Sequence, residues 1–375
     1  MSRPTCTAVI AGTMFILIAT TVWAAPAEIR TLEIGAAAPD FALPGVDGKK
    51  HKLSEYHKAK VLVVLFTCNH CPTAQAYEDR IKALAADYKD KGVVLVAISP
   101  NDPQAVRLDE LGYTDLGDSL ADMKIRAKDK GFNFHYLYDG NKQEVSKGYG
   151  PMTTPHVFIF DGERKLRYVG RVDNNEKQPD KVTSSDARNA IEALLAGRPV
   201  PVEKTKTFGC SIKWSDKRPS VKQGFEKWAQ EPVNLQTIDL DGVKKVLKND
   251  SDDLYLVNIW STRCGPCVAE FPEFIEINRM YRGREFKMVS INVEGSEAKD
   301  RALSFLKKNQ ASFTNYLYDG DVYAFIDAVD PKWPGAIPYT LLIKPQGEVA
   351  YRHLGEIEPL AVRKAVVECL GRVYK

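Results

Sequence analysis

Four of the seven cysteines fall into two Cys-x-x-Cys pairs, Cys68 with Cys71 and Cys264 with Cys267. In such a pair, one thiolate can attack a disulfide, and the thiol one helical turn later can attack the mixed disulfide and release the reduced substrate. Seven cysteines among 375 residues are too few for a scaffold held together by disulfides, so their spacing carries the information. That spacing predicts thiol-disulfide exchange at two places in the chain.

The same residues are compatible with other chemistry. A pair can be a structural disulfide, and Cys68, His70 and Cys71 could bind soft copper as a carrier without catalysis. Zinc would need all four paired thiols at one point, which two separate domain cores do not readily allow. Neither pair is followed directly by histidine, which excludes the usual c-type haem motif. His70 is more often a solvent-facing residue of the turn that tunes the charge of the thiolate.

Two cysteines lie outside the pairs and downstream of the first one. Cys210 could resolve a disulfide with Cys68 or Cys71, or relay electrons to the second half of the chain. A small buried residue is an equally good interpretation of Cys210. Cys369 has apolar neighbours in a helical pattern, so we expect it in the core.

Two charged residues are weaker candidates for catalysis. Glu270 lies one turn after Cys267 and could assist proton transfer, although acids are favoured in the first turns of any helix. Arg171 follows an expected strand and could aid peroxide chemistry, although an exposed hairpin charge is the commoner explanation.

Each pair is expected between a buried strand and a helix, where unpaired backbone N–H groups favour a thiolate. The first half predicts strands at 61–66 and 93–98, helices at 72–89 and 185–195, and a hairpin of 156–160 with 165–169. The second half predicts a short strand ending at 238, a helix at 241–247, strands at 254–259 and 288–293, and a Cys-bearing helix between these strands. We therefore expect the helix N-terminus to favour a thiolate in the same way at both pairs.

The sequence Tyr-Leu-Tyr-Asp-Gly occurs at 136–140 and again at 316–320, which predicts that the chain contains one fold twice. Each copy precedes a strand that starts at a proline, Pro155 or Pro338. Pro338 suits a cis-proline that holds backbone beside the second pair. The predicted fold class is α/β, with two tandem domains of a central mixed sheet flanked by helices.

The second half resembles the thioredoxin superfamily, especially its exported cytochrome-maturation (TlpA/ResA-like) branch, over about residues 233–373. The resemblance rests on the motif Cys-Gly-Pro-Cys after a Trp-containing strand end, then Glu-Phe-Pro and Ile-Pro-Tyr-Thr-Leu-Leu-Ile. It implies that Cys264 attacks, Cys267 resolves and Pro338 presents the substrate backbone. The sequence departs from the family at Arg263, where Trp is common, and at Asn258, where thioredoxin has an acid. Arg263 should favour the thiolate, whereas Asn258 removes a proton acceptor.

The first half resembles the redoxin family, the alkyl-hydroperoxide-reductase and thiol-specific-antioxidant (AhpC/TSA) group, over roughly residues 33–195. Cys71-Pro-Thr matches the peroxidatic motif of peroxiredoxins, and Pro155 after Thr154 precedes the strand His-Val-Phe-Ile-Phe. Cys68 replaces the threonine of that motif and Val64 replaces its proline. Both changes move the expectation from a peroxidase toward thioredoxin-like exchange, with Cys68 attacking, Cys71 resolving and Pro155 positioning the substrate.

Composition and charge indicate an ordinary globular protein. Hydrophobic residues make up 44% and charged residues 27%, and a net charge of +3 without a basic run argues against nucleic acid as a partner. Residues 1–24 read as a signal peptide, with Arg3 before an uncharged stretch at 8–22 and small residues before the expected cleavage site. An uncleaved anchor is the alternative. Cys6 would leave with the signal.

These observations predict a signal at 1–24, a redoxin-like domain at 30–200, a linker at 201–232 and a thioredoxin-like domain at 233–375. The expected function is that of an exported, periplasmic or extracytoplasmic thiol-disulfide oxidoreductase that needs no cofactor. Protein disulfides are the expected substrates, and a membrane thiol carrier is the expected reductant. The alternatives are a thiol peroxidase that uses Cys71 with the second domain as its reductant, and the copper-binding protein.

Overall fold

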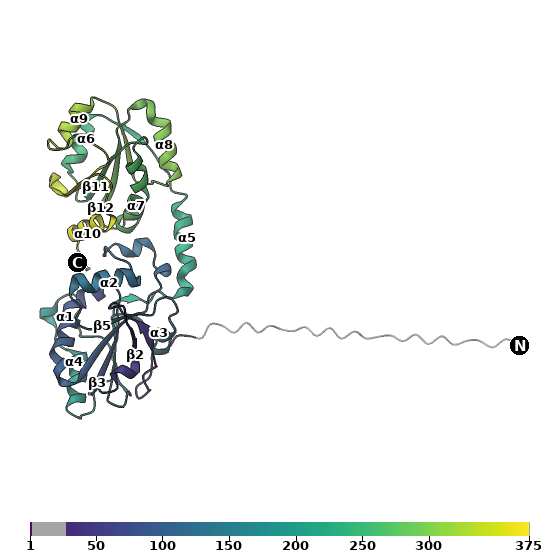
Figure 1. The fold of residues 1–375 in the computed structure, drawn as a ribbon, viewed down its shortest axis with the longest axis vertical. Coiled ribbons are helices and arrows are strands. Elements are labelled where there is room, and N and C mark those ends of the chain that lie inside the picture. Colours follow the sequence, from purple (N-terminus) through teal and green to yellow (C-terminus); the bar gives the residue numbers. More distant parts are fainter. Residues whose placement is uncertain (2–27, 375) are drawn as a thin grey trace.

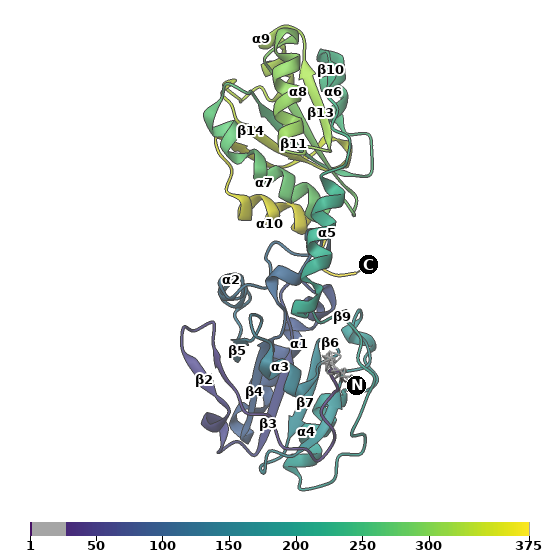
Figure 2. The same cartoon turned by 90° about the vertical axis from the view of Figure 1, so that its right-hand side faces the viewer.

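The computed structural model describes residue 1 and residues 28–374, so the predicted signal peptide and Cys6 lie outside the described residues. The described chain forms two sheet-containing domains stacked along the long axis of the molecule (Figures 1 and 2). Helix α5 (Arg218–Trp228) runs beside their junction. Within the described residues, every helix is too short or too polar to cross a membrane.

The first domain is built on a five-stranded mixed sheet in the order β5-β4-β3-β7-β8. The strands are β3 (Val61–Phe66), β4 (Val93–Ser99), β5 (His135–Tyr138), β7 (His156–Phe160) and β8 (Leu166–Gly170), and the helices are α1 (Pro72–Tyr88), α2 (Leu120–Lys130), α3 (Glu144–Tyr149) and α4 (Asp186–Leu195). A small hairpin of β1 (Ala42–Pro44) and β2 (Lys50–Lys52) lies beside the sheet.

The alternation of side chains along β3 explains its continuous apolar sequence. Val61, Val63 and Leu65 pack into one core with α1 and α4, whereas the intervening residues pack into a second core on the opposite face with Tyr149 of α3. A strand buried on both faces needs an apolar residue at every position. The predicted hairpin is confirmed, since β7 and β8 pair antiparallel.

The second domain repeats this arrangement with one additional edge strand, in the order β10-β13-β12-β11-β14-β15. The strands are β10 (Gln236–Ile238), β11 (Leu254–Trp260), β12 (Phe286–Asn292), β13 (Thr314–Tyr318), β14 (Tyr339–Ile343) and β15 (Val349–Leu354), and the helices are α6 (Leu240–Lys248), α7 (Gly265–Tyr281), α8 (Lys299–Lys308), α9 (Val322–Val329) and α10 (Pro359–Leu370). The repeated Tyr-Leu-Tyr lies in β5 of one domain and β13 of the other, next to equivalent strands. The predicted α/β class is confirmed.

The segment predicted as a linker contains regular structure. Helix α5 presents Trp228 to the guanidinium groups of Arg279 and Arg282 on the second domain. Strand β9 (Cys210–Ser211) pairs antiparallel with β6 (Thr153–Thr154) of the first domain. Local periodicity missed both elements because α5 buries only Trp228 and β9 has only two residues.

The two domains meet where the C-terminal ends of α7 and α10 approach residues 106–115 of the first domain. The Tyr281 hydroxyl donates to the carbonyl of Thr114 at 2.7 Å, and Arg284 donates to the carbonyl of Gly112 at 2.9 Å. Arg372 forms a two-pronged ion pair with Asp115 at 2.5 and 3.0 Å. The end of the second domain that lies opposite the N-terminus of α7 therefore contacts the first domain.

Candidate functional site

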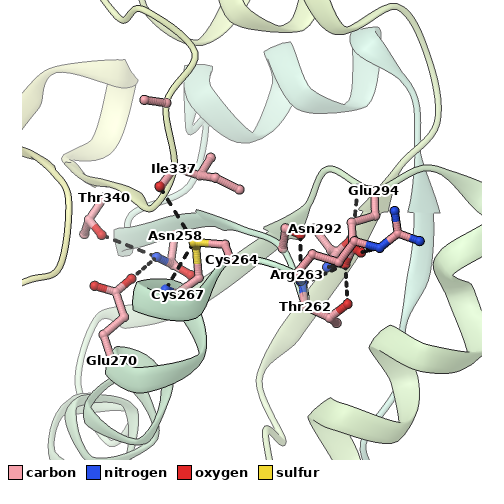
Figure 3. Close-up of a disulfide and its surroundings, with 12 residues drawn as sticks. Asn258, Thr262, Arg263, Cys264, Cys267, Glu270, Asn292, Glu294, Ile337 and Thr340 are labelled. Atoms are coloured by element: carbon pink, nitrogen blue, oxygen red, sulfur yellow. Dashed lines mark hydrogen bonds and ion pairs between the residues drawn. A yellow bond between two sulfur atoms is a disulfide. The ribbon is translucent and has the colours of Figure 1, made fainter.

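The second cysteine pair lies where β11 ends and α7 begins (Figure 3). Cys264 and Cys267 form a disulfide in this structure. Cys264 is the N-cap residue of α7, and its Sγ accepts a hydrogen bond from the backbone N–H of Cys267 at 3.2 Å. Cys264 is half-buried and Cys267 is fully buried, so the first sulfur of the pair is the one that a partner can reach.

The backbone before Pro338 lies against this disulfide. The Ile337–Pro338 peptide bond is cis, as predicted, and the carbonyl oxygen of Ile337 lies 3.7 Å from the Sγ of Cys264. The Thr154–Pro155 bond of the first domain is also cis. Both prolines therefore stand beside a cysteine pair.

A buried carboxyl group lies behind the second pair, one turn along α7. Glu270 accepts hydrogen bonds from the Asn258 side chain at 3.0 Å and from the backbone N–H of Ile357 at 2.9 Å (Figure 3). Burial raises the pKa of Glu270 to about 7, although these two hydrogen bonds oppose the shift. Asn258 itself cannot exchange a proton, but its hydrogen-bond partner Glu270 is an acid that can do so near neutral pH.

Arg263 projects away from the disulfide toward an acidic residue that the sequence analysis missed. Its guanidinium group lies 3.7 Å from Glu294, which also binds Arg301 and accepts hydrogen bonds from the backbone and hydroxyl of Thr262 (Figure 3). Despite partial burial, these contacts hold the pKa of Glu294 at about 2. Arg263 is therefore paired with Glu294 instead of being directed at the Cys264 sulfur.

The first cysteine pair joins its helix differently, and the expectation of equal geometry is wrong. Helix α1 begins at Pro72, so Cys71, rather than Cys68, is the N-cap residue. Its Sγ accepts from the backbone N–H of Ala74 at 3.4 Å. Proline is favoured at the first helical position because its fixed backbone angle suits the helix and it has no N–H to leave unpaired. In the second domain the proline lies between the cysteines, at Pro266, and the helix starts earlier.

Both thiols of the first pair are buried and are not joined by a disulfide. The Cys71 thiol contacts the Thr154 carbonyl at 3.2 Å, and the Cys68 sulfur lies 3.3 Å from the Thr154 hydroxyl. Burial would raise the pKa of Cys71, but hydrogen bonds from Cys210 and Cys68, together with the charge of His70, hold it well below its ordinary value. Burial and the hydrogen bond to Cys71 raise the pKa of Cys68. The surroundings therefore favour the thiolate at Cys71, whereas the resemblance led us to expect Cys68 as the attacking and Cys71 as the resolving cysteine.

His70 is buried, which corrects the expectation that it faces solvent. Its Nδ1 lies 2.6 Å from a carboxylate oxygen of Asp118, which also accepts from the Asn101 amide at 2.7 Å. Burial lowers the pKa of His70, but the adjacent Asp118 more than compensates and raises it. Asp118 thus favours the charged form of His70, and this charge in turn favours the Cys71 thiolate.

The possible copper ligands in the structure differ from the expected Cys68, His70 and Cys71. Within the described part of the chain, candidate ligand atoms of Cys68, His70 and Asp118 lie within 4.8 Å of one another, and Cys71 is not a member of this group. Asp118 already binds His70, and its other oxygen accepts from the backbone N–H groups of Asn69 and His70. This carboxylate is occupied as a hydrogen-bond acceptor.

The remaining candidates divide between the first site and the surface. Cys210 lies against Cys71, as one of the hypotheses for it required. Cys369 is exposed, so the expectation of a core position is wrong; it falls on the outer face of α10, between the buried Val367 and Leu370. Arg171 pairs with Asp186 at 2.7 Å instead of approaching a thiol.

The structure does not bring the two cysteine pairs together. Cys264 stands at the N-terminus of α7, whose opposite end contacts the first domain through Tyr281. A helix of 17 residues at 1.5 Å per residue separates these ends by about 25 Å. The first pair, in contrast, lies close to the junction, because Tyr374 from the end of the second domain lies near enough to Cys210 and Cys71 for their charges to affect its pKa.

Comparison with known proteins finds two matching families in tandem. The AhpC/TSA family matches residues 34–169, and the Redoxin family matches residues 214–367, starting within the segment predicted as a linker.

Several curated relatives are named for disulfide chemistry. Thiol-disulfide oxidoreductase ResA of Geobacillus thermodenitrificans is 22% identical over 38% of this chain and 71% of its own length, and ResA of Bacillus subtilis is 28% identical over 34% and 67%. Thiol:disulfide interchange protein DsbE of Escherichia coli is 28% identical over 28% of this chain and 51% of its own length.

Two solved structures are also similar to parts of the chain. An uncharacterized conserved protein from Geobacillus kaustophilus is 39% identical, with 49% of this chain and 93% of that chain covered and a TM-score of 0.44. A putative thiol:disulfide interchange protein DsbE from Chlorobium tepidum is 23% identical, with 44% and 99% covered and a TM-score of 0.34.

Proposed function

We propose that this chain, a thiol-disulfide oxidoreductase with an AhpC/TSA domain followed by a Redoxin domain, is exported and reduces protein disulfides through Cys264 and Cys267. The observation that carries the proposal is the difference in burial within this pair. Cys264 is reachable at the N-terminus of α7, whereas Cys267 is fully buried directly behind it. The reachable thiol attacks, and the protected thiol completes the exchange.

The exchange proceeds in two balanced steps. The Cys264 thiolate attacks one sulfur of the substrate disulfide, forms a mixed disulfide and releases the other substrate sulfur as a thiolate. Cys267 then loses its proton and attacks the Cys264 sulfur, which forms the Cys264–Cys267 disulfide and releases the second substrate thiolate. Two electrons pass from the protein to the substrate. Glu270 is placed to take up a proton near neutral pH in the second step.

Pro338 has a positioning role in this proposal. The Ile337 carbonyl lies beside Cys264, so the backbone next to Pro338 is close to the reacting sulfur. There it can hold an extended segment of the substrate against this sulfur. Pro155 stands in the equivalent place in the first domain, where the backbone of Thr154 is already paired with β9. The second site is therefore the one that accepts protein substrates.

The reducing direction and the export rest on the sequence. The Gly265-Pro266 dipeptide resembles the reducing members of the superfamily, and a thiol carrier in the membrane is the proposed electron donor. The uncharged stretch at 8–22 supports export to the periplasm or an equivalent extracytoplasmic compartment. Expression with the native N-terminus should give an extracytoplasmic protein that begins at Ala25, as measured by the mass of its N-terminal peptide. Recovery from the cytoplasm with residues 1–24 intact would contradict export.

Insulin reduction with dithiothreitol as electron donor tests the reductase activity. Cys264→Ser should abolish the catalysed rate, and Cys267→Ser should accumulate a mixed disulfide that mass spectrometry detects. A matched variant, Cys369→Ser, removes an exposed cysteine far from the pair and should keep the full rate. A wild-type rate in a chain that lacks both Cys264 and the first pair would refute the assignment.

Peroxide reduction at Cys71 is a second candidate, favoured by the position of this residue at the N-cap of α1 and by its complete burial. A thiolate with a lowered pKa that protein substrates cannot touch suits a small oxidant. Stopped-flow measurement of hydrogen peroxide consumption should show a loss of rate in Cys71→Ser. Equal consumption by the variant would exclude the peroxidase.

A further inference from the structure

Cys210 is held at the first cysteine site by strand pairing. Strand β9 pairs with β6 so that Cys210 is the cross-strand partner of Thr154, whose carbonyl accepts a hydrogen bond from Cys71. The backbone at Gly209 comes so close to Thr154 that a Cβ there would meet its carbonyl oxygen at 2.1 Å. Gly209 also has a φ of +135°, which L side chains rarely adopt. Glycine at this position permits the close approach.

The residues that follow Cys210 are anchored to the first domain by hydrogen bonds from buried side chains. The Gln143 side chain, which is fully buried, donates to the carbonyl of Lys213 at 2.9 Å and accepts from the backbone N–H of Ser215 at 2.9 Å. The backbone of Lys213 also donates to the Asn101 side chain at 2.9 Å. These contacts on one side, and β6 on the other, fix the position of Cys210.

Cys71 is the shared neighbour of the other two thiols. Cys71 packs in one small cluster with Cys68 and Cys210, and both thiols influence its pKa. Cys68 and Cys71 are buried, whereas Cys210 is partly exposed and lies near Tyr374. Cys71 can therefore form a disulfide with either neighbour, and Cys210 is the neighbour that faces solvent.

We propose that Cys210 is the third reactive cysteine of the first site and that the oxidised form of this site is a Cys71–Cys210 disulfide that joins the inter-domain segment to the first domain. In the reaction with a small disulfide, the Cys71 thiolate forms a mixed disulfide and releases one thiolate. Cys210 then loses its proton to solvent and attacks the Cys71 sulfur, which releases the second thiolate. Two protein thiols are oxidised and one small disulfide is reduced to two thiols.

Peptide mapping of the full chain tests this inference, which rests on the proposed redox role of the first site. The background is Cys264→Ser/Cys267→Ser, equilibrated in oxidised and reduced dithiothreitol, alkylated and digested with trypsin. Cleavage after Lys60 and Arg80 gives one peptide with both Cys68 and Cys71, and cleavage after Lys206 and Lys213 gives another with Cys210. A disulfide-linked pair of these peptides is expected, and it should persist in Cys68→Ser and disappear in Cys210→Ser.

Gly209→Ala tests whether the position of Cys210 matters, because the variant keeps the cysteine but should displace the strand that carries it. The added Cβ should move β9 off Thr154 and lower the yield of linked peptide by about tenfold, with all three thiols retained. Gly224→Ala in α5 is the matched control because its Cβ would meet nothing closer than 3.9 Å, and it should keep the wild-type yield.

Two results would overturn the inference, and they differ in what else they exclude. An internal Cys68–Cys71 disulfide with Cys210 alkylated would show that the first pair is redox-active without Cys210. Three cysteines that stay fully alkylated in the most oxidising buffer would exclude a redox role of the first site altogether. The proposed activity at Cys264 would stand in both cases because it resides in the other domain.

Discussion

At the scale of single residues, the two sites differ in which cysteine the fold exposes. Cys264 is half-exposed and capped onto α7, whereas Cys71 is capped onto α1 but completely buried. A buried thiolate needs nearby donors and charge to be stable, and the first site supplies them through two thiols and the His70–Asp118 pair. The second site relies on the helix terminus and on a carboxyl group behind its buried cysteine.

Glu270 should make the stability of the second domain depend on pH. Its pKa of about 7 in the folded protein exceeds the ordinary value of 4.5, so the folded state binds the proton more tightly between these values. The free energy of unfolding should therefore fall as the pH rises from about 4.5 to about 7 and then level off. Glu270→Gln, which cannot ionise, should remove this slope in urea unfolding measured at pH 5, 6, 7 and 8. Glu276→Gln, on a partly exposed side chain of the same helix, should retain it. An unchanged slope in Glu270→Gln would contradict the assignment.

Asp118→Asn should raise the pKa of the Cys71 thiol. Without the carboxylate, His70 loses the contact that keeps it charged, and Cys71 loses a stabilising positive charge. Thiolate absorbance near 240 nm, titrated in a chain with Cys264 and Cys267 replaced by serine, measures the shift. Asp129→Asn, at an exposed position of α2, serves as the control. The account fails if both variants titrate like the parent.

At the scale of elements, the start of each helix decides which cysteine of the pair is the N-cap residue. Pro72 starts α1 after the first pair, while Pro266 lies within the second pair and α7 starts between its cysteines. With the same Cys-x-x-Cys spacing, the second cysteine (Cys71) therefore caps the helix in the first domain, and the first cysteine (Cys264) caps it in the second domain. Strand β9 then pairs with the backbone of Thr154 at the first site, whereas Ile337 at the second site is partly exposed.

Gln143→Ala should loosen the segment that carries β9. The variant leaves the carbonyls of Pro100 and Lys213 and the N–H of Ser215 without their side-chain partner, at a cost of about 1–3 kcal/mol for buried groups. Limited trypsin digestion should cut faster after Lys213 and Lys217. The exposed Gln178→Ala should digest like the wild type, and equal rates in Gln143→Ala would show that β9 is held by other contacts.

At the scale of the whole molecule, the domains place the two sites apart. The first site lies at the junction beside Tyr374, and the second lies at the far end of α7, about 25 Å from the contact of Tyr281 with Thr114. This arrangement argues against the second domain as a built-in reductant for Cys71 within one chain. Exchange between the sites requires either a second molecule or a separation of the domains.

Electron transfer between the two pairs should therefore depend on protein concentration. A chain reduced only at Cys264 and Cys267 should reduce the first site in a second-order reaction, so that the initial rate rises about fourfold for each doubling of concentration. Quenched alkylation at several concentrations measures this rate. A first-order transfer that is independent of concentration would show that the domains rearrange within one chain.

The sequence by itself determined the α/β class, the strands and helices around each pair, the β7–β8 hairpin and the proline beside each site. These features follow from local apolar periodicity, helix signals and turn residues, which act between neighbours in the chain. The Tyr-Leu-Tyr-Asp-Gly repeat also identified the doubled fold, since equivalent strands conserve their place in both sheets.

Only the tertiary structure decided which thiol is reachable, that His70 is buried against Asp118, that Cys369 faces outward and that Cys210 lies on Cys71. His70 and Asp118 are 48 residues apart, and Cys210 meets a strand more than 50 residues before it. Such contacts form because separate elements pack together, and burial, charge and hydrogen bonding then set the reactivity of each thiol. The spacing of the cysteines along the chain identifies the reactive groups. Their environment is set by residues that are distant in the sequence, and the spacing does not predict these contacts.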